Sequence, residues 1–238
     1  MSHAGDAVPG LALRMKEGTR RAHRWIERLA FVRSFLRGVV DRDSYQRLLV
    51  DLYYVYGALE SALWAHRQHP AVAPVILPAL FRAEAIAADL DFLGAQGLGR
   101  PWRMRPMSQA ALAYTQRLRQ ISQHSPELLV AHCYTRYLGD LSGGQILRRM
   151  TGLALRLDDA GGLRYYDFPQ ILDISGFKSE FRRRLDSLPL TEEQRLAVIA
   201  EAVRAFGLSG ALFDALPVPV RPAPARASSS RFSDTQAL

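Results

Sequence analysis

The chain has one cysteine, Cys133, among 238 residues, so no internal disulfide can form. Long apolar runs are also missing. No stretch of about 20 apolar residues occurs, and we therefore expect no membrane span. The first ten residues lack the basic start and apolar core of a signal peptide. A lone thiol and the absence of a signal peptide together lead us to expect a cytoplasmic protein.

Sustained strand-like alternation of polar and apolar residues is absent too, and apolar positions recur at helical spacing instead. We expect helices over residues 11–29, 41–68, 79–93, 108–123, 125–155, 175–185 and 191–216. Residues 94–106 and 158–174 are expected to be irregular. The prediction is one all-α domain over residues 11–216. A flexible N-terminus (1–10) precedes it, and a disordered Pro/Ala/Ser-rich tail (217–238) follows.

Acidic residues are fewer than basic ones: 23 Asp and Glu against 31 Lys and Arg give a net charge of +8. Such a balance favours an acidic partner, which includes nucleic acid, anionic lipid, an acidic protein or an anionic ligand. No zinc-finger spacing or RNA-binding aromatic motif accompanies the charge. We therefore expect no nucleic acid as partner.

Three glycines interrupt an expected long helix, within the segment Tyr134–Gln145. Each glycine in a helix interior costs roughly 1 kcal/mol relative to alanine. Gly139 and Gly143 share one face, which fits either tight packing of another helix or a planar ligand lying against the backbone. Asp140 lies one turn before Gly144, and a buried carboxylate needs hydrogen-bond partners. We therefore expect an ordered polar network at Asp140.

Residues 141–145 read Leu-Ser-Gly-Gly-Gln, which matches the signature motif of ABC-type ATPases. Such ATPases also need a phosphate-binding Gly-x-x-x-x-Gly-Lys-Ser/Thr loop that follows a strand. This chain has neither that loop nor the pattern of a parallel sheet. The ATPase interpretation is therefore set aside.

A histidine on the first expected helix has charged neighbours on its own face. Lys16, Arg20, His23 and Glu27 are spaced by four, three and four residues. A neutral imidazole is a strong iron ligand, and its second nitrogen usually donates to a carboxylate or carbonyl. The two basic residues suit the carboxylates of a ligand. A solvated basic face with an incidental histidine has the same spacing, so the helix alone does not decide.

Five blocks of this sequence, in order, resemble the heme oxygenase family of the soluble bacterial type. They lie at residues 16–27, 51–60, 134–145, 177–184 and 205–213, and the resemblance covers about residues 11–216. It implies an all-α, single-domain helical bundle with haem between a proximal helix and a kinked distal helix.

The resemblance also implies roles for particular residues. His23 becomes the axial ligand of the haem iron, and Glu27 orients its imidazole. Asp140 holds a water that acts on an Fe–OOH intermediate, beside the oxygen-facing Gly139 and Gly143. Tyr56 and Arg136 support this distal network. The residues implied to contact haem are Lys16, Arg20, Tyr134, Gly144, Lys178, Arg182 and Phe206.

The implied reaction is cleavage of haem b, both substrate and cofactor, by O2 and electrons to biliverdin, CO and ferrous iron. The implied partners are an acidic electron donor, such as a ferredoxin or a flavodoxin-like protein, and a downstream bilin acceptor. Two alternatives of similar architecture are a non-catalytic haem-binding protein and a thiamin-degrading enzyme. Asp140 and the three glycines argue against the first. The second needs a catalytic cysteine, and Cys133 lies in no nucleophile motif.

Overall fold

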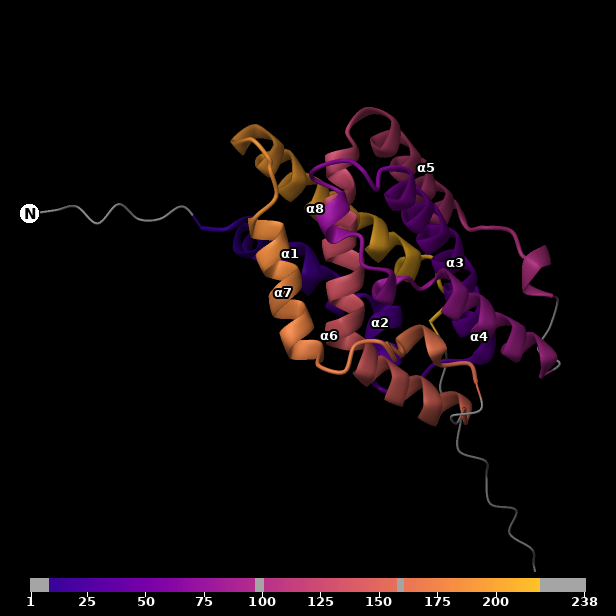
Figure 1. The fold of residues 1–238 in the computed structure, drawn as a ribbon. Coiled ribbons are helices and arrows are strands. Elements are labelled where there is room, and N and C mark those ends of the chain that lie inside the picture. Colours follow the sequence, from indigo (N-terminus) through magenta and orange to yellow (C-terminus); the bar gives the residue numbers. More distant parts are fainter. Residues whose placement is uncertain (1–8, 97–100, 158–160, 219–238) are drawn as a thin grey trace, which may run out of the picture.

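The structure is a computed structural model that describes residues 9–96, 101–157 and 161–218, and these ranges are helical without a strand (Figure 1). The α-helices are α1 (Leu11–Arg28), α2 (Ala30–Leu36), α3 (Arg42–Ala65), α4 (Ala83–Ala95), α5 (Gln109–His124), α6 (Leu129–Leu155), α7 (Ile174–Asp186) and α8 (Glu192–Asp214). The 3-10 helices are η1 (Ala73–Val75), η2 (Pro78–Leu80), η3 (Trp102–Met104), η4 (Pro126–Leu128) and η5 (Arg164–Tyr166). The all-α prediction is confirmed.

Local capping signals explain where several helices begin. The Ser108 hydroxyl accepts the backbone N–H of Ala111 at 3.1 Å and caps α5. Thr191 and Gln194 form the reciprocal bonds of a capping box at the start of α8. Both of these helix starts were predicted from the sequence, and both are confirmed.

Several segments differ from the sequence prediction. Helix α2 was not expected, and it buries Phe31 and Phe35 one turn apart against the core. Helix α4 begins at Ala83 rather than residue 79, because the Glu60 carboxylate accepts the N–H of Arg82 at 2.5 Å and fixes the first turn there. The expected irregular stretch 94–106 contains η3. Nearly all of the predicted flexible end (1–10) and disordered tail (217–238) lies outside the described residues.

Helix α6 occupies the middle of the bundle (Figure 1). It packs against α2, α3, α7 and α8, and α1 lies against α7 and α8. Almost every side chain of its N-terminal part, residues 129–138, is buried, whereas residues 139–150 are largely exposed or half-buried. The helix is continuous, yet its C-terminal part runs in a different direction from its N-terminal part (Figure 1). The glycine-bearing segment thus lies where α6 leaves the core.

By length and composition alone, α8 is the one helix in the described part of the chain that could cross a membrane. In this bundle it packs against α1, α5 and α6. It also carries the buried Glu201, whose carboxylate bonds to side chains of α5 and α6. These contacts are those of a core helix.

Candidate active site

Four side chains form a closed hydrogen-bonded ring beside the middle of α6. Tyr56 on α3 donates its hydroxyl to Oδ2 of Asp140, and Tyr165 on η5 donates to Oδ1 of the same carboxylate at 2.8 Å. Arg136 donates through Nε to the Tyr56 oxygen at 3.1 Å and through Nη2 to the Tyr165 oxygen at 3.3 Å. We call these four residues the Asp140 ring. It confirms the polar network that the sequence predicted at Asp140.

The guanidinium of Arg136 fixes the direction of every bond in the ring. It carries N–H donors and no acceptor, so both tyrosine oxygens accept from it and their own O–H groups point away. Both O–H groups then donate to Asp140, one to each carboxylate oxygen. Each oxygen keeps a further lone pair. Because the Asp140 side chain is 12% exposed, it can still accept one small donor from outside the ring.

Burial governs the protonation of the ring. It raises the pKa of the Asp140 carboxyl, and the charge of Arg136 and the two tyrosine hydrogen bonds oppose that rise. Burial also holds the pKa values of Tyr56 and Tyr165 well above their usual range, so both phenols keep their protons. Two neutral hydroxyls therefore connect a guanidinium to a carboxylate.

His23, the predicted iron ligand, lies on the solvent-exposed face of α1. Its side chain is 59% exposed, and Nδ1 lies 3.4 Å from Oε1 of Glu27, one turn further along the helix. Phe206 of α8 contacts the imidazole edge to face, with 5.8 Å between ring centroids. Among the described residues, Nε2 of His23 has no hydrogen-bond partner, so this nitrogen is available to a ligand.

Tyr134 marks the place where α1, α6 and α7 meet. Burial raises the pKa of its phenol, and a hydrogen bond with Thr19 of α1 and the charge of Arg182 of α7 oppose the rise. Lys178, one turn before Arg182, places Nζ 3.5 Å from the hydroxyl of Ser142 on α6. On α1, the exposed cations Lys16 and Arg20 flank Thr19 in the sequence.

These four cations share a further property. None of them has a carboxylate partner within the described ranges; they are Lys16, Arg20, Lys178 and Arg182. Unpaired cations on adjacent helices are suited to an anionic ligand.

The glycines of α6 do not all serve the same purpose. Apart from the adjoining residues and backbone of α6 itself, a methyl group built on Gly139 or on Gly143 would meet no described atom within 4 Å. Tight packing of another helix would place atoms there, so the structure contradicts the packing interpretation for these two residues. A methyl group on the buried Gly144 would instead lie 3.7 Å from the ring of Tyr166. The open backbone at Gly139 and Gly143, beside Asp140, fits a flat ligand such as a porphyrin.

Sequence reasoning missed Tyr165 and the residue that holds it. The buried carboxylate of Asp89 on α4 accepts the backbone N–H groups of Arg164 and Tyr165 at 2.9 and 2.8 Å. This pair of bonds fixes η5 against α4. One signal in the sequence could have indicated Tyr165: two adjacent tyrosines, Tyr165 and Tyr166, stand in a segment expected to be irregular. A buried tyrosine hydroxyl usually has a hydrogen-bond partner, so such a pair indicates polar contacts with the core.

A second buried polar cluster joins α5, α6 and α8. His132 places Nε2 3.1 Å from Glu201 and Nδ1 3.2 Å from the Tyr114 hydroxyl. Arg117 donates to both oxygens of Glu201, at 2.9 and 2.6 Å. Burial acts to raise the pKa of Glu201, but the hydrogen bonds from His132 and Arg117 outweigh it and bring that pKa to about 2. The cluster holds together the helices that support the ring.

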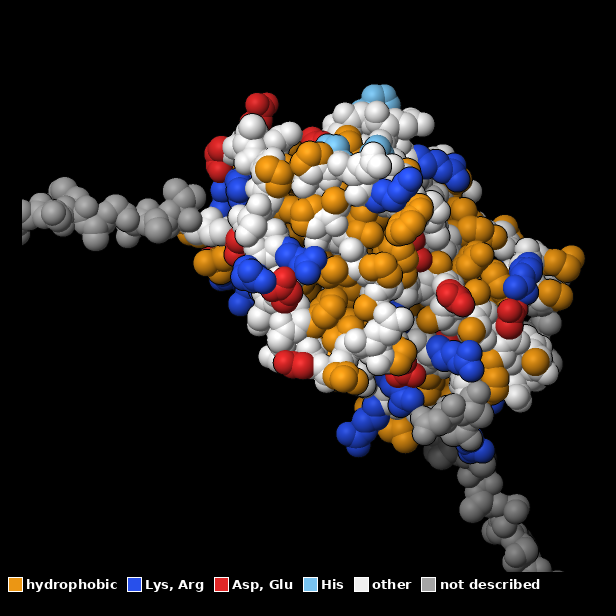
Figure 2. All heavy atoms as spheres, in the orientation of Figure 1, with side chains coloured by type: hydrophobic (Ala, Val, Ile, Leu, Met, Phe, Trp, Pro, Cys, Tyr) orange, Lys and Arg blue, Asp and Glu red, His pale blue; other side chains and the backbone are white. Residues whose placement is uncertain are grey.

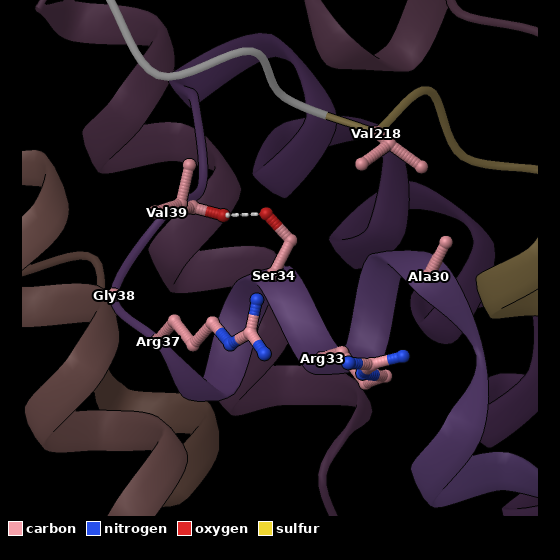
Figure 3. A pocket seen from close by; sticks show the side chains of 7 residues that line it. All are labelled: Ala30, Arg33, Ser34, Arg37, Gly38, Val39 and Val218. Atoms are coloured by element: carbon pink, nitrogen blue, oxygen red, sulfur yellow. Dashed lines mark hydrogen bonds between the residues drawn. The ribbon is translucent and has the colours of Figure 1, made fainter.

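A cavity of about 630 Å³ lies elsewhere, on α2 and the turn that follows it (Figure 3). Arg33 and Arg37 line it, and the Ser34 hydroxyl donates to the Val39 carbonyl at its wall. None of its lining residues was predicted to belong to the site.

Comparison with known proteins identifies the family. The family model described as Heme oxygenase matches residues 9–215. A heme oxygenase of Porphyra purpurea is 42% identical over 210 residues, which are 88% of this chain and 87% of the relative. The solved heme oxygenase from Leptospira interrogans is 40% identical with a TM-score of 0.82, covering 87% of this chain and 100% of that one. Heme oxygenase-1 from Synechocystis, solved in complex with heme, is 39% identical with a TM-score of 0.81. The match covers 87% of this chain and 91% of that one. The chain therefore belongs to the heme oxygenase family, as the five sequence blocks predicted.

Proposed function

We propose that the chain, an oxidoreductase that acts on haem, uses O2 and electrons to cleave haem to biliverdin, CO and ferrous iron. The haem would lie between α1 and α6. One observation carries the proposal: the Asp140 ring adjoins two glycines with open space before them, while Nε2 of His23 on α1 has no partner among the described residues. A ring with a fixed direction of hydrogen bonding beside a flat open surface is suited to proton delivery to a planar substrate.

On the proximal side, His23 would hold the haem iron. The Glu27 carboxylate, 3.4 Å from Nδ1, would keep the imidazole proton on Nδ1 and thereby leave the Nε2 lone pair for the metal. Phe206 lies across the imidazole and restricts its rotation. The spacing on α1 predicted this pair, and the contact with α8 adds a third group that orients the ring.

The anionic propionates of haem are held by basic residues and one phenol. Arg182 and Tyr134 lie close enough for the arginine charge to act on the phenol, and Lys178 lies on the same helix as Arg182. Lys16 and Arg20 approach from α1. Ion pairs between these basic residues and the two propionates would stabilise bound haem. They would also set how the haem is rotated within its own plane.

Bound haem supplies the iron at which oxygen is activated. The chain supplies placement and protons. Gly139 and Gly143 leave room above the porphyrin, with Gly144 buried behind them. Asp140 accepts a hydrogen bond from a water on its open side, which leaves the other proton of that water free to point toward the haem. Tyr56 and Arg136 hold the carboxylate in one orientation.

The electrons come from an acidic protein such as a ferredoxin or a flavodoxin-like protein. The net charge of +8 supports this partner, and Figure 2 shows Lys and Arg side chains spread around a central apolar area on the face drawn. Opposite charge on the two proteins speeds their encounter. The product would pass to a bilin-accepting protein, with the reaction taking place in the cytoplasm.

The test is to mix the chain with haem, ascorbate or reduced ferredoxin, and oxygen. We expect the Soret band to give way to a biliverdin spectrum, with chromatography naming the isomer. His23→Ala should abolish turnover, and added imidazole should restore it. His124→Ala is the matched control, because His124 lies exposed at the end of α5. Asp140→Ala should bind haem but yield no biliverdin. A parent chain that binds haem and degrades none would instead be a non-catalytic haem-binding protein.

A further inference from the structure

We propose that Tyr165 is a positioning residue for haem cleavage, acting with Tyr56 to hold both oxygens of the Asp140 carboxylate. The inference deepens the proposed function and rests on it. Tyr165 donates to Oδ1 at 2.8 Å, while Tyr56 donates to Oδ2. With one donor, a carboxylate can still rotate about its Cβ–Cγ bond. With a donor on each oxygen, its plane is fixed.

The plane of the carboxylate decides where its free lone pairs point. Each oxygen uses one lone pair on a tyrosine, so the remaining pair on each lies in the plane of the carboxylate, and the 12% exposure of the Asp140 side chain leaves room for a water there. A water that donates to one of these pairs therefore has a defined position. Tyr165 acts through Asp140 and that water, and it is not itself a proton donor to substrate.

Tyr165 is placed rigidly enough for this role. The backbone N–H groups of Arg164 and Tyr165 donate to the fully buried Asp89. At the C-terminal end of η5, the Arg82 guanidinium donates to the carbonyl of Asp167. The phenol ring of Tyr165 packs at 6.0 Å from that of Tyr56, and Arg136 donates to its oxygen. The hydroxyl thus meets Asp140 from a backbone fixed by α4.

Several titratable or charged groups influence Asp140, and all of them except Tyr165 must stay in place when Tyr165 is changed. They are Arg136 and Tyr137 on α6, Tyr56 on α3, Tyr114 on α5, Tyr165 and Tyr166 on η5, and Arg82 before α4. Only two of the tyrosines donate to the carboxylate within the described residues. Removing either hydroxyl should therefore have a larger effect than removing one of the others.

The first measurement uses the chain without haem, with 13C-labelled aspartate followed by NMR across pH. We expect Tyr165→Phe to raise the pKa of Asp140 by about one unit, a tenfold change in its protonation equilibrium. Tyr166→Phe is the matched control. It removes a buried hydroxyl of the same 3-10 helix. Among the described residues, that hydroxyl lies 3.4 Å from the Thr151 hydroxyl and makes no hydrogen bond to Asp140. An unchanged pKa in Tyr165→Phe, with a raised pKa in Tyr56→Phe, would overturn the proposal.

A second measurement needs no change to Tyr165. In the parent chain, the hydroxyl proton of Tyr165 should exchange slowly with water, and Asp140→Ala should make that exchange fast. Rapid exchange in the parent chain would show that the hydrogen bond is absent.

The third measurement adds haem, a reductant and oxygen. Tyr165→Phe should slow biliverdin formation several-fold and move its pH profile in the direction of the Asp140 shift, whereas Tyr166→Phe should do neither. A shifted carboxyl pKa with unchanged biliverdin formation would refute the positioning role. If the parent chain itself forms no biliverdin, the proposed function fails, and the haem-free NMR result still decides whether the Tyr165 hydrogen bond exists.

Discussion

Replacing Gly139 or Gly143 by alanine should stabilise the haem-free chain and weaken haem binding. Alanine is favoured over glycine in a helix interior by roughly 0.5–1 kcal/mol. A Cβ at either position meets no described atom within 4 Å, so no steric cost offsets this gain. Each substitution is therefore expected to raise the melting temperature by about 1–4 °C for a domain of this size.

The effect on the ligand should have the opposite sign. In the proposed complex, the porphyrin lies against the backbone of these glycines, and a methyl group would occupy the same space. Adding methyl groups to a well-packed region typically costs about 1–3 kcal/mol. We therefore expect the haem dissociation constant to rise by about fivefold to 100-fold.

Two other glycines serve as controls. Gly57 lies in the middle of α3, and a Cβ there also meets nothing within 4 Å, so Gly57→Ala should stabilise without changing haem affinity. A Cβ on Gly18 would lie 2.9 Å from Cγ2 of Ile199, so Gly18→Ala should destabilise. Circular dichroism of the haem-free variants and Soret titration with haem measure the two quantities. A Gly139→Ala variant that melts earlier than the parent, or binds haem equally well, would refute the reasoning.

Two further predictions concern charge. Glu201→Gln should lower the free energy of unfolding by about 3 kcal/mol at pH 7, because the folded pKa of about 2 lies well below the ordinary 4.5. A depressed carboxyl pKa stabilises the fold above pH 4.5, and this contribution disappears as pH falls toward 2. Urea unfolding of parent and variant should therefore converge at pH 2, and an equal difference at both pH values would contradict the linkage. Turnover with an acidic ferredoxin should fall as ionic strength rises, because salt screens the attraction to a chain of charge +8. A rate with ferredoxin that ignores salt would count against this partner.

Elements defined by local signals could be predicted from the sequence. Ser108 and Thr191 cap α5 and α8 as their spacing indicated. The pair His23 and Glu27 needed only the geometry of one helix, because residues four apart always lie on neighbouring turns. The sequence also selected Asp140 as the centre of a polar network, since a carboxylate beside three glycines of a core helix needs partners.

The remaining parts depended on contacts between residues far apart in the chain. Tyr165 meets Asp140 only because Asp89, about 75 positions earlier, holds the backbone of η5. No helical periodicity or capping rule indicates such a contact. Helix α2 was missed for a related reason: it is a seven-residue helix, and short helices are stabilised mainly by tertiary packing.

The two halves of α6 have different roles: the N-terminal half stabilises the fold, and the C-terminal half carries the proposed site. Residues 129–138 are almost entirely buried and anchor the helix. The next turns carry two helix-weakening glycines with no packing in front of them and a carboxylate that burial disfavours. Features that cost stability without a packing reason are typical of sites kept for ligand binding. If haem fills this space, it should restore the missing contacts, so bound haem should protect the backbone amides of residues 139–146 from hydrogen exchange more than those of 129–138. Uniform protection along α6 would mean that the two halves respond to the ligand as one unit.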